Sequence, residues 1–374
     1  MRKSTFIAVV LLASTLDVGC AASGEGVKKE AAASPAFEFI APQPMRPGRT
    51  RPVVAVIGEN YFTELSDYIV PYGVLTESGV AEVIALATKP GPIQMFPARL
   101  RIEPHATSAE FDARFPDGAD YVIVPAVHRD EDPALIGWVQ AQAAKGARIV
   151  GVCDGVWVVA NAGLLKGRRA AGHWYSLENL QRKFTKTRWE KNRRYVADGN
   201  VVTTTGASAS IPVSLALVEA IGGRERALAV AKSLGVADWS PAHRSDDFQL
   251  NARHTFTAAR NWLAFWSHEK IGVPVSPGSD EIALALTADA YSRTYRSTAY
   301  FVSKSNVPIK TRRGLVLLPD SVVGVSAAPD RTLPALDGTS APASALDAAL
   351  KGIEQSYGQA TAAFVALQLE APRP

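Results

Sequence analysis

Cysteine is scarce in this sequence, which has only Cys20 and Cys153 among its 374 residues. That count excludes a scaffold held together by disulfide bonds. The six histidines and two cysteines show no spacing typical of metal ligands, and no glycine-rich phosphate-binding loop is present. We therefore predict no metal, no nucleotide and no other cofactor.

A long hydrophobic run is also missing, because the longest apolar stretch near the start covers only residues 6–12. It is far shorter than the roughly 20 residues that cross a bilayer, and it follows Arg2 and Lys3. Residues 1–22 therefore predict a secretory signal. Cys20 lies in a sequence that resembles a bacterial lipoprotein cleavage box, so lipidation of Cys20 and ordinary cleavage after Ala22 are both open alternatives.

Residues 23–50 show no sustained apolar period and are rich in Ala, Gly, Pro and Lys. This composition predicts a flexible tether. Together with the signal it predicts an exported, periplasmic protein, held at the membrane by a lipid anchor if Cys20 is acylated. Cys153 would then be the only thiol of the mature chain.

Residues 51–238 carry the pattern of an α/β domain. Near-continuous Val/Ile runs at 52–58, 81–87, 121–125 and 147–152 alternate with helical patterns. Such runs indicate a mostly parallel sheet with helices on both faces. Residues 92–103 predict a hairpin excursion, and the turn at 198–200 predicts a hairpin between strands at 195–197 and 201–204. The hydrophobic share of 47% is enough to fill a large core.

Residues 239–374 predict a small α+β C-terminal extension of unknown role. Its first helix covers 250–266 and places Trp262 and Trp266 on one face, where we expect them in the core. A last helix is predicted at 346–367. No internal repeat is visible in the sequence.

The strongest local feature lies at residues 149–157, where a predicted strand ends at Cys153 and a helix begins at once. This strand–turn–helix pattern is typical of a nucleophile elbow. A helix amino terminus stabilises negative charge, so we expect it to depress the pKa of the thiol. Asp154 would oppose the thiolate unless its side chain caps the helix.

Cys153 in its elbow, residues 167–174 and residues 198–209 together resemble the ThiJ/PfpI superfamily. The resemblance covers roughly residues 53–234 and is closest to the branch with isonitrile hydratase and the amidase-like domain of AraC-family regulators. It implies the class I glutamine amidotransferase-like fold, a flavodoxin-like three-layer sandwich. Relatives are often dimers, which implies a homodimer here. A late histidine, His243, lacks the spacing to a carboxylate that glutaminase chemistry needs.

The resemblance also implies roles for individual residues. Cys153 matches the family nucleophile, Asp67 the acidic residue that contacts it, and His173 the histidine near that cysteine. A carboxyl that keeps or shares a proton beside a thiol is suited to nucleophilic and acid–base chemistry. The backbone N–H groups of Asp154 and of the Gly58 loop are candidate oxyanion donors.

These residues are consistent with two alternative functions. The first is an exported cysteine-dependent hydratase or hydrolase, a lyase- or hydrolase-type enzyme acting on a small carbonyl, amide-like or isonitrile-like substrate. The alternative is a non-catalytic ligand-binding or redox stress-sensing module. The net charge of +4 is mild, and the basic stretch at 166–194 predicts a solvated face, so no nucleic-acid partner is expected.

Overall fold

The computed structural model describes residues 38–336 and 338–372, and these belong to one compact unit. The predicted signal at 1–22, Cys20 and most of the predicted tether lie outside the described residues. Within the described chain, no helix is both long enough and apolar enough to cross a bilayer.

A seven-stranded sheet forms the centre of the main domain, and six of its strands run parallel. The one antiparallel strand, β11, pairs with β12 through the predicted hairpin. The mostly parallel sheet predicted from the Val/Ile runs is therefore confirmed. In order across the sheet, the strands are β11 (Tyr195–Asp198), β12 (Val201–Thr204), β8 (Arg148–Gly151), β7 (Tyr121–Val124), β1 (Val53–Gly58), β3 (Glu82–Ala87) and β6 (Ala106–Thr107).

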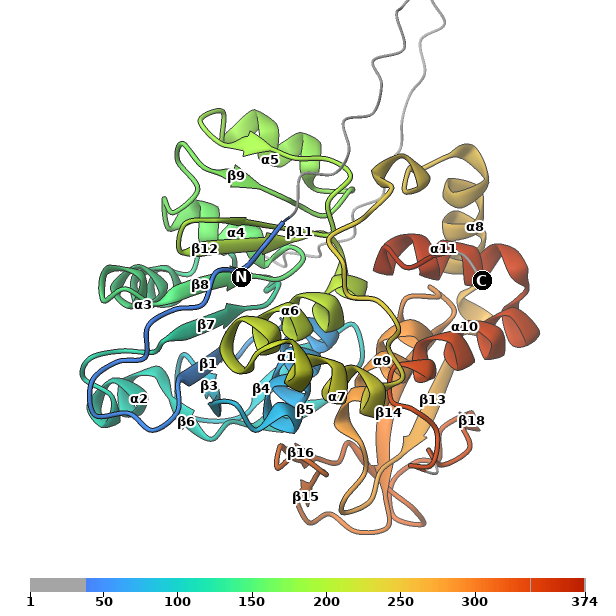
Figure 1. The fold of residues 1–374 in the computed structure, drawn as a ribbon. Helices are drawn as coiled ribbons and strands as arrows, with labels where there is room; N and C mark the ends of the chain where they lie inside the picture. The colour runs from blue at the N-terminus through green and yellow to red at the C-terminus, as the bar shows by residue number, and fades with distance from the viewer. Residues whose placement is uncertain (1–37, 337, 373–374) are drawn as a thin grey trace, which may run out of the picture. The chain divides into compact units, whose positions relative to one another are not determined.

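Helices cover both faces of this sheet and complete a three-layer sandwich (Figure 1). Residues of β1 alternate between the two cores, with Val54 and Val56 on one side and Val53, Ala55 and Ile57 on the other. One face carries α1 (Leu65–Ser78), α6 (Ser210–Gly222) and α7 (Arg224–Leu234); the other carries α2 (Ser108–Arg114), α3 (Pro133–Ala144) and α4 (Gly155–Asn161).

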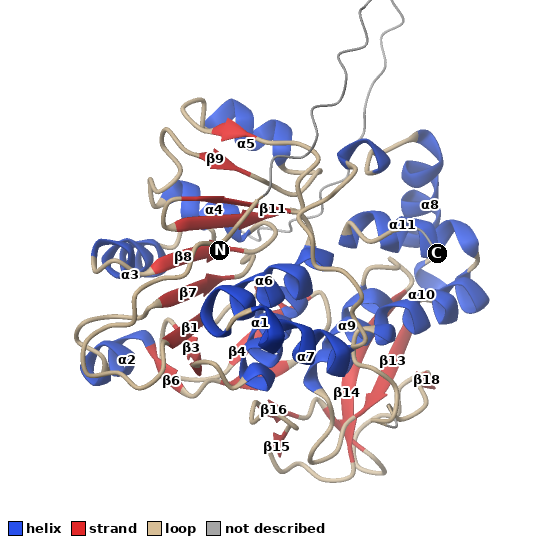
Figure 2. Cartoon of the chain, in the orientation of Figure 1, coloured by secondary structure: helices blue, strands red, loops and turns tan. Residues whose placement is uncertain are grey.

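Short elements complete the main domain (Figure 2). A hairpin at β4 and β5 confirms the excursion predicted at 92–103. The smaller elements are β2 (Thr63–Glu64), β4 (Ile93–Phe96), β5 (Arg101–Glu103), β9 (Arg169–Ala170), α5 (Leu177–Lys183), β10 (Arg188–Trp189) and the 3₁₀ turns at Ala207–Ala209 and Ser245–Asp247.

The C-terminal extension is an additional α/β region whose four-stranded sheet is parallel throughout. Its order is β17-β14-β13-β18, and a further hairpin, β15–β16, pairs with β5 of the main domain. The elements are α8 (Ala252–Leu263), a 3₁₀ turn (Phe265–Ser267), β13 (Glu269–Pro274), α9 (Glu281–Ser292), β14 (Ser297–Ser303), β15 (Ile309–Lys310), β16 (Val316–Leu318), β17 (Ser321–Val322), β18 (Arg331–Thr332), α10 (Ser344–Tyr357) and α11 (Gln359–Leu369).

The extension repeats the backbone plan of the main domain, although its sequence shows no repeat. The strand order β6-β3-β1-β7 reappears as β17-β14-β13-β18. Helix α1 begins twelve positions after the first residue of β1, and α9 begins twelve positions after that of β13. A helical hairpin ends each plan, with one glycine between its helices: Gly223 at φ 83° and Gly358 at φ 86°. We call residues 269–369 the second repeat.

Helices α1 and α9 pack against each other as the two halves of a two-fold contact. The second residue of α1, Ser66, donates to the ninth residue of α9, Asp289, at 2.7 Å. Conversely, a Cβ added to the ninth residue of α1, Gly73, would lie 2.6 Å from the second residue of α9, Ile282. Reciprocal contacts of this kind are the mark of a self-complementary interface.

Two sequence predictions about the extension were wrong. Trp262 and Trp266 are 43% and 77% exposed, so they lie outside the core. The last helix, predicted to be continuous over 346–367, is broken at Gly358 because the chain turns there with positive φ.

Candidate active site

Cys153 occupies a sharp turn between β8 and α4, as the elbow pattern predicts. Its φ of 51° lies in the left-handed region that a residue with a side chain rarely adopts. Gly155 makes the turn possible, because a Cβ there would lie 2.1 Å from the carbonyl oxygen of Val124 at the end of β7. The backbone N–H of Cys153 donates to Thr204 Oγ1 at 2.9 Å, which anchors the turn to β12.

The thiol of Cys153 is only 8% exposed, and its pKa is raised well above the ordinary value. Burial is the main cause, and the carboxyl groups of Asp67, Asp154 and Glu64 add to it. The expectation that the helix would depress this pKa was wrong, because burial and the neighbouring carboxyl groups raise it. Asp154 makes no capping hydrogen bond at the start of α4. Cys153 is therefore a thiol at neutral pH.

Asp67 is the third residue of α1 and is completely buried. Burial raises its pKa to about 8, against the opposing effects of a hydrogen bond from Ala126 and of the Arg293 charge. Oδ2 accepts the N–H of Ala126 at 3.2 Å, whereas Oδ1 is buried without a hydrogen-bond partner among the described residues. The carboxyl thus keeps its proton at neutral pH, the state that the resemblance implies.

A buried ion network links this site to the second repeat, and sequence reasoning missed it. Glu64, the N-cap of α1, accepts the N–H of Asp67 at 2.6 Å and pairs with Arg293 Nη2 at 2.5 Å. Arg293, which follows α9, also pairs with Asp289 at 2.7 Å. The positive charge of Arg293 lowers the pKa of both Cys153 and Asp67. Only the i,i+4 spacing of Asp289 and Arg293 hinted at this pairing.

His173 lies under the C-terminal end of the chain. Its Nε2 is 3.1 Å from the carbonyl oxygen of Gln368, and its Nδ1 is buried without a hydrogen-bond partner in the described chain. The next residue, Trp174, donates to the carbonyl oxygen of Leu367 at 2.8 Å. The contact of the His173 ring is thus to the C-terminal residues, and its predicted support of the thiol stays a prediction.

Glu370, which directly follows α11, binds the C-terminal residues to the main domain. Its Oε2 accepts the N–H of Gly206 at 2.6 Å, and its Oε1 is 2.8 Å from His243 Nε2. Ser208 Oγ donates to its carbonyl oxygen at 2.7 Å. His243 therefore meets a carboxylate 127 positions later rather than one close in sequence. We call residues 367–371 the C-terminal tail.

The two candidate oxyanion donors differ in their surroundings. The side chain of Asp154 has one oxygen buried without a partner among the described residues. Its backbone directly follows Cys153, which keeps its N–H a candidate. A Cβ added at Gly58 would lie 3.0–3.1 Å from Ile93, Tyr68 and Thr63, and the role of the Gly58 loop as a donor stays a prediction.

The two best-defined cavities lie away from Cys153. One, of about 220 Å³, is lined by residues from α8, α10 and α11, among them Arg253 and Glu354. The other, of about 390 Å³, lies at residues 244–248. Neither cavity is lined by Cys153 or Asp67. Within residues 38–336 and 338–372, no three His, Cys, Asp or Glu side chains are grouped to hold a metal ion.

Comparison with known proteins identifies the main domain. Residues 53–220 match the model of the DJ-1/PfpI family. The HTH-type transcriptional regulator GbdR of Pseudomonas aeruginosa is 34% identical over 97 residues, which are 26% of this chain and 26% of that protein. Isonitrile hydratase of Pseudomonas putida is 33% identical over 111 residues, 30% of this chain and 47% of that protein. The chain thus matches between about a quarter and a half of these relatives.

Solved structures align with about half of the chain. DJ-1beta of Drosophila melanogaster aligns with a TM-score of 0.45 at 20% identity, covering 50% of this chain and all of that one. A ThiJ/PfpI family protein from Pseudomonas syringae aligns with a TM-score of 0.43 at 22% identity, covering 50% of this chain and 75% of that one.

Proposed function

Residues 53–220 of this chain are a domain of the DJ-1/PfpI family, and from that premise we propose that the protein is a cysteine-dependent enzyme that adds water to a small uncharged substrate. The observation that supports this most is the pairing of two protonated groups in one buried site: the thiol of Cys153 and the carboxyl of Asp67, whose pKa is about 8. Neither group alone is suited to the reaction at neutral pH.

The carboxyl of Asp67 can relay a proton in a single step. As Sγ of Cys153 bonds to the electrophilic carbon, one carboxyl oxygen gives its proton to the substrate, and the other oxygen takes the proton of the thiol. The buried Oδ1, which has no partner among the described residues, is the oxygen free for this exchange. With an isonitrile, water then adds to the carbon of the covalent adduct, the S–C bond breaks, and the sulfur recovers a proton as the hydrated product leaves. With an amide, the C–N bond breaks first and the amine leaves with the proton given by Asp67, after which water hydrolyses the thioester and the sulfur recovers its proton.

The charge of the site supports an uncharged substrate. Asp67, Asp154 and Glu64 all raise the pKa of the thiol, and only Arg293 opposes them. Arg293 is already paired with Glu64 and Asp289, so it offers no free charge to an anion. Isonitriles, simple carbonyls and amides meet this requirement.

A direct assay tests the proposal. The purified full-length protein is incubated separately with a small alkyl isonitrile, a dicarbonyl and an aliphatic amide, and products are followed by proton NMR. We expect turnover of at least one class that is lost in Cys153→Ala and Asp67→Asn and kept in Asp320→Asn, a half-buried carboxyl outside the site. No turnover of any class, or equal turnover by Cys153→Ala, would refute the proposal.

The alternative is a ligand-binding or redox-sensing module without turnover. The raised pKa of Cys153 weighs against the sensor, because oxidation proceeds through the thiolate. The similarity to the regulator GbdR suggests DNA binding as another function. However, α10 and α11 are joined by Gly358 alone, whereas a helix-turn-helix motif uses a turn of three or four residues. We therefore retain the prediction of no nucleic-acid partner, which anisotropy titration with duplex DNA would test.

Export to the periplasm is also part of the proposal, with lipidation of Cys20 and ordinary cleavage after Ala22 as the two alternatives. They rest on the charge and apolar pattern of residues 1–22. Mass spectrometry of the amino terminus from cells of the native host would show an acylated Cys20, cleavage after Ala22, or an intact start. The last result would refute export by this signal.

A further inference from the structure

Helix α8 is built with its polar side inward. Its buried residues are His254, Thr257 and Asn261, which lie on one side at i, i+3 and i+7. Asn261 Nδ2 donates to the carbonyl oxygen of Thr294 at 2.9 Å and to Thr361 Oγ1 at 3.0 Å. The helix is thus held to the second repeat by hydrogen bonds rather than by apolar packing.

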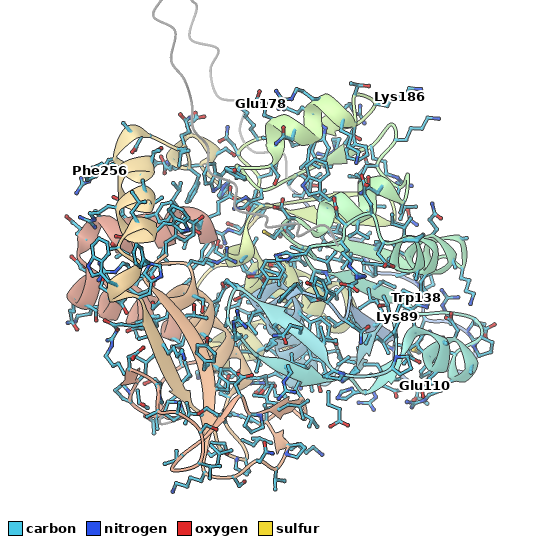
Figure 3. The ribbon with its side chains drawn as sticks, turned by 180° about the vertical axis from the view of Figure 1, so that it is seen from behind. Lys89, Glu110, Trp138, Glu178, Lys186 and Phe256 are labelled. Atoms are coloured by element: carbon cyan, nitrogen blue, oxygen red, sulfur yellow. The ribbon has the colours of Figure 1, made fainter. Side chains whose placement is uncertain are left out.

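The opposite side of the helix and the turn after it are apolar and exposed. The exposed fractions reach 67% at Phe256 and 73% at Phe265, and Figure 3 shows Phe256 projecting from α8 at the edge of the molecule. We call this surface the α8 face: Phe256, Trp262, Leu263, Phe265 and Trp266. Burying polar groups while exposing large apolar ones reverses the usual order, which indicates that the face is covered by a partner.

The charged residues beside the α8 face indicate which kind of partner covers it. Residues 248–268 contain no Asp or Glu, and they include the exposed Arg253 and Arg260 on α8. A second copy seated by a two-fold axis would bring these arginines toward their own counterparts. Trp, Phe and Leu beside arginines are instead the composition of a helix lying in a membrane interface, with the aromatic rings at headgroup depth.

We propose that the α8 face binds the headgroup–acyl boundary of an anionic lipid bilayer, with Arg253 and Arg260 contacting lipid phosphates. The α8 face lies on the second repeat and includes none of the residues around Cys153. The proposal therefore stands independently of the enzyme function and of how the chain is exported.

Vesicle binding tests the proposal with the full-length protein. We would compare co-sedimentation with phosphatidylcholine vesicles, with and without phosphatidylglycerol, for the wild type and for Trp262→Gln/Phe265→Ser/Trp266→Gln. These side chains are exposed, so the variant should keep its fold, which circular dichroism checks. We expect affinity for the anionic vesicles to fall at least about ten-fold. The matched control Leu228→Ser/Val325→Ser removes exposed apolar groups elsewhere and should bind like the wild type.

The arginines have a separate signature. Arg253→Gln/Arg260→Gln should lower affinity for the anionic vesicles by roughly five-fold per charge, and leave binding to neutral vesicles unchanged. The absence of vesicle binding, or binding that the triple variant leaves intact, would overturn the proposal. Concentration-dependent dimerisation that only the triple variant abolishes, without vesicle binding, would assign the face to a second copy instead.

Discussion

Replacing Asp67 with asparagine should stabilise the fold at neutral pH while abolishing turnover. Folding raises the pKa of Asp67 from 3.8 to about 8, mainly by burial, so the folded protein holds a proton that the unfolded chain releases. Stability is then fully present below pH 4 and is lost as the pH rises to about 8. Four pKa units at about 1.4 kcal/mol each amount to roughly 6 kcal/mol, of which about 4 kcal/mol is lost by pH 7.

Asparagine matches the protonated carboxyl in shape and cannot ionise. Its amide oxygen can keep the hydrogen bond from Ala126, and its amide nitrogen would take the place of Oδ1. That position has no partner among the described residues, and Asp154 and Asp289 lie close enough to raise the pKa of Asp67. The variant should therefore match the wild type near pH 4 and exceed it by several kcal/mol at pH 8.

Urea unfolding followed by tryptophan fluorescence at intervals from pH 4 to pH 8 measures this difference. Asp320→Asn is the matched control, because Asp320 accepts one backbone N–H from Phe301 and its pKa is raised only to about 6. Its gain in stability should stop growing near pH 6, whereas that of Asp67→Asn should grow until about pH 8. A constant difference between Asp67→Asn and the wild type across this range would refute the reasoning.

Three further predictions follow from the same contacts. Arg293→Gln should cost about 3–5 kcal/mol of unfolding free energy because it leaves buried carboxylates unpaired, whereas Arg224→Gln on an exposed pair should cost less than about 1 kcal/mol; equal losses would contradict this. Iodoacetamide labelling against pH should give Cys153 an apparent pKa above the ordinary thiol value, lowered by Asp154→Asn; a low wild-type value would show that the site is open and charged. Glu370→Ala should release the C-terminal tail and speed this labelling roughly five- to thirty-fold, the factor for 1–2 kcal/mol; an unchanged rate would mean that the tail does not control access.

Local patterns were enough to predict the main domain. Its Val/Ile runs became parallel strands because a strand buried on both faces needs apolar residues at every position. The turn at Gly199 became the predicted hairpin, and the elbow at Cys153 formed where a strand pattern met a helix pattern. Each of these features is decided by residues close together in the sequence.

Features that depend on distant residues could not be predicted. Glu64 and Arg293 are 229 positions apart, and no pattern in either segment predicts that they pair. The α8 tryptophans have the spacing of a buried stripe, and only the hydrogen bonds of Asn261 show which side faces inward. The raised pKa of Cys153 likewise depends on its burial and on carboxyl groups from distant segments that the fold places around it.

The second repeat packs against α1 of the main domain through α9. By the two-fold relation Arg293 corresponds to Glu77, because each stands at the thirteenth position from its helix start. The contact is therefore symmetric in its backbone but not in its charges. Arg293, which follows α9, pairs with Glu64 at the start of α1. Asp280 at the start of α9 instead pairs with Arg313, which belongs to the second repeat itself. The arginine of the second repeat thereby acts on the site of Cys153, whose pKa it lowers. A homodimer must then use a surface other than α1, because this chain already covers α1 with its own second repeat.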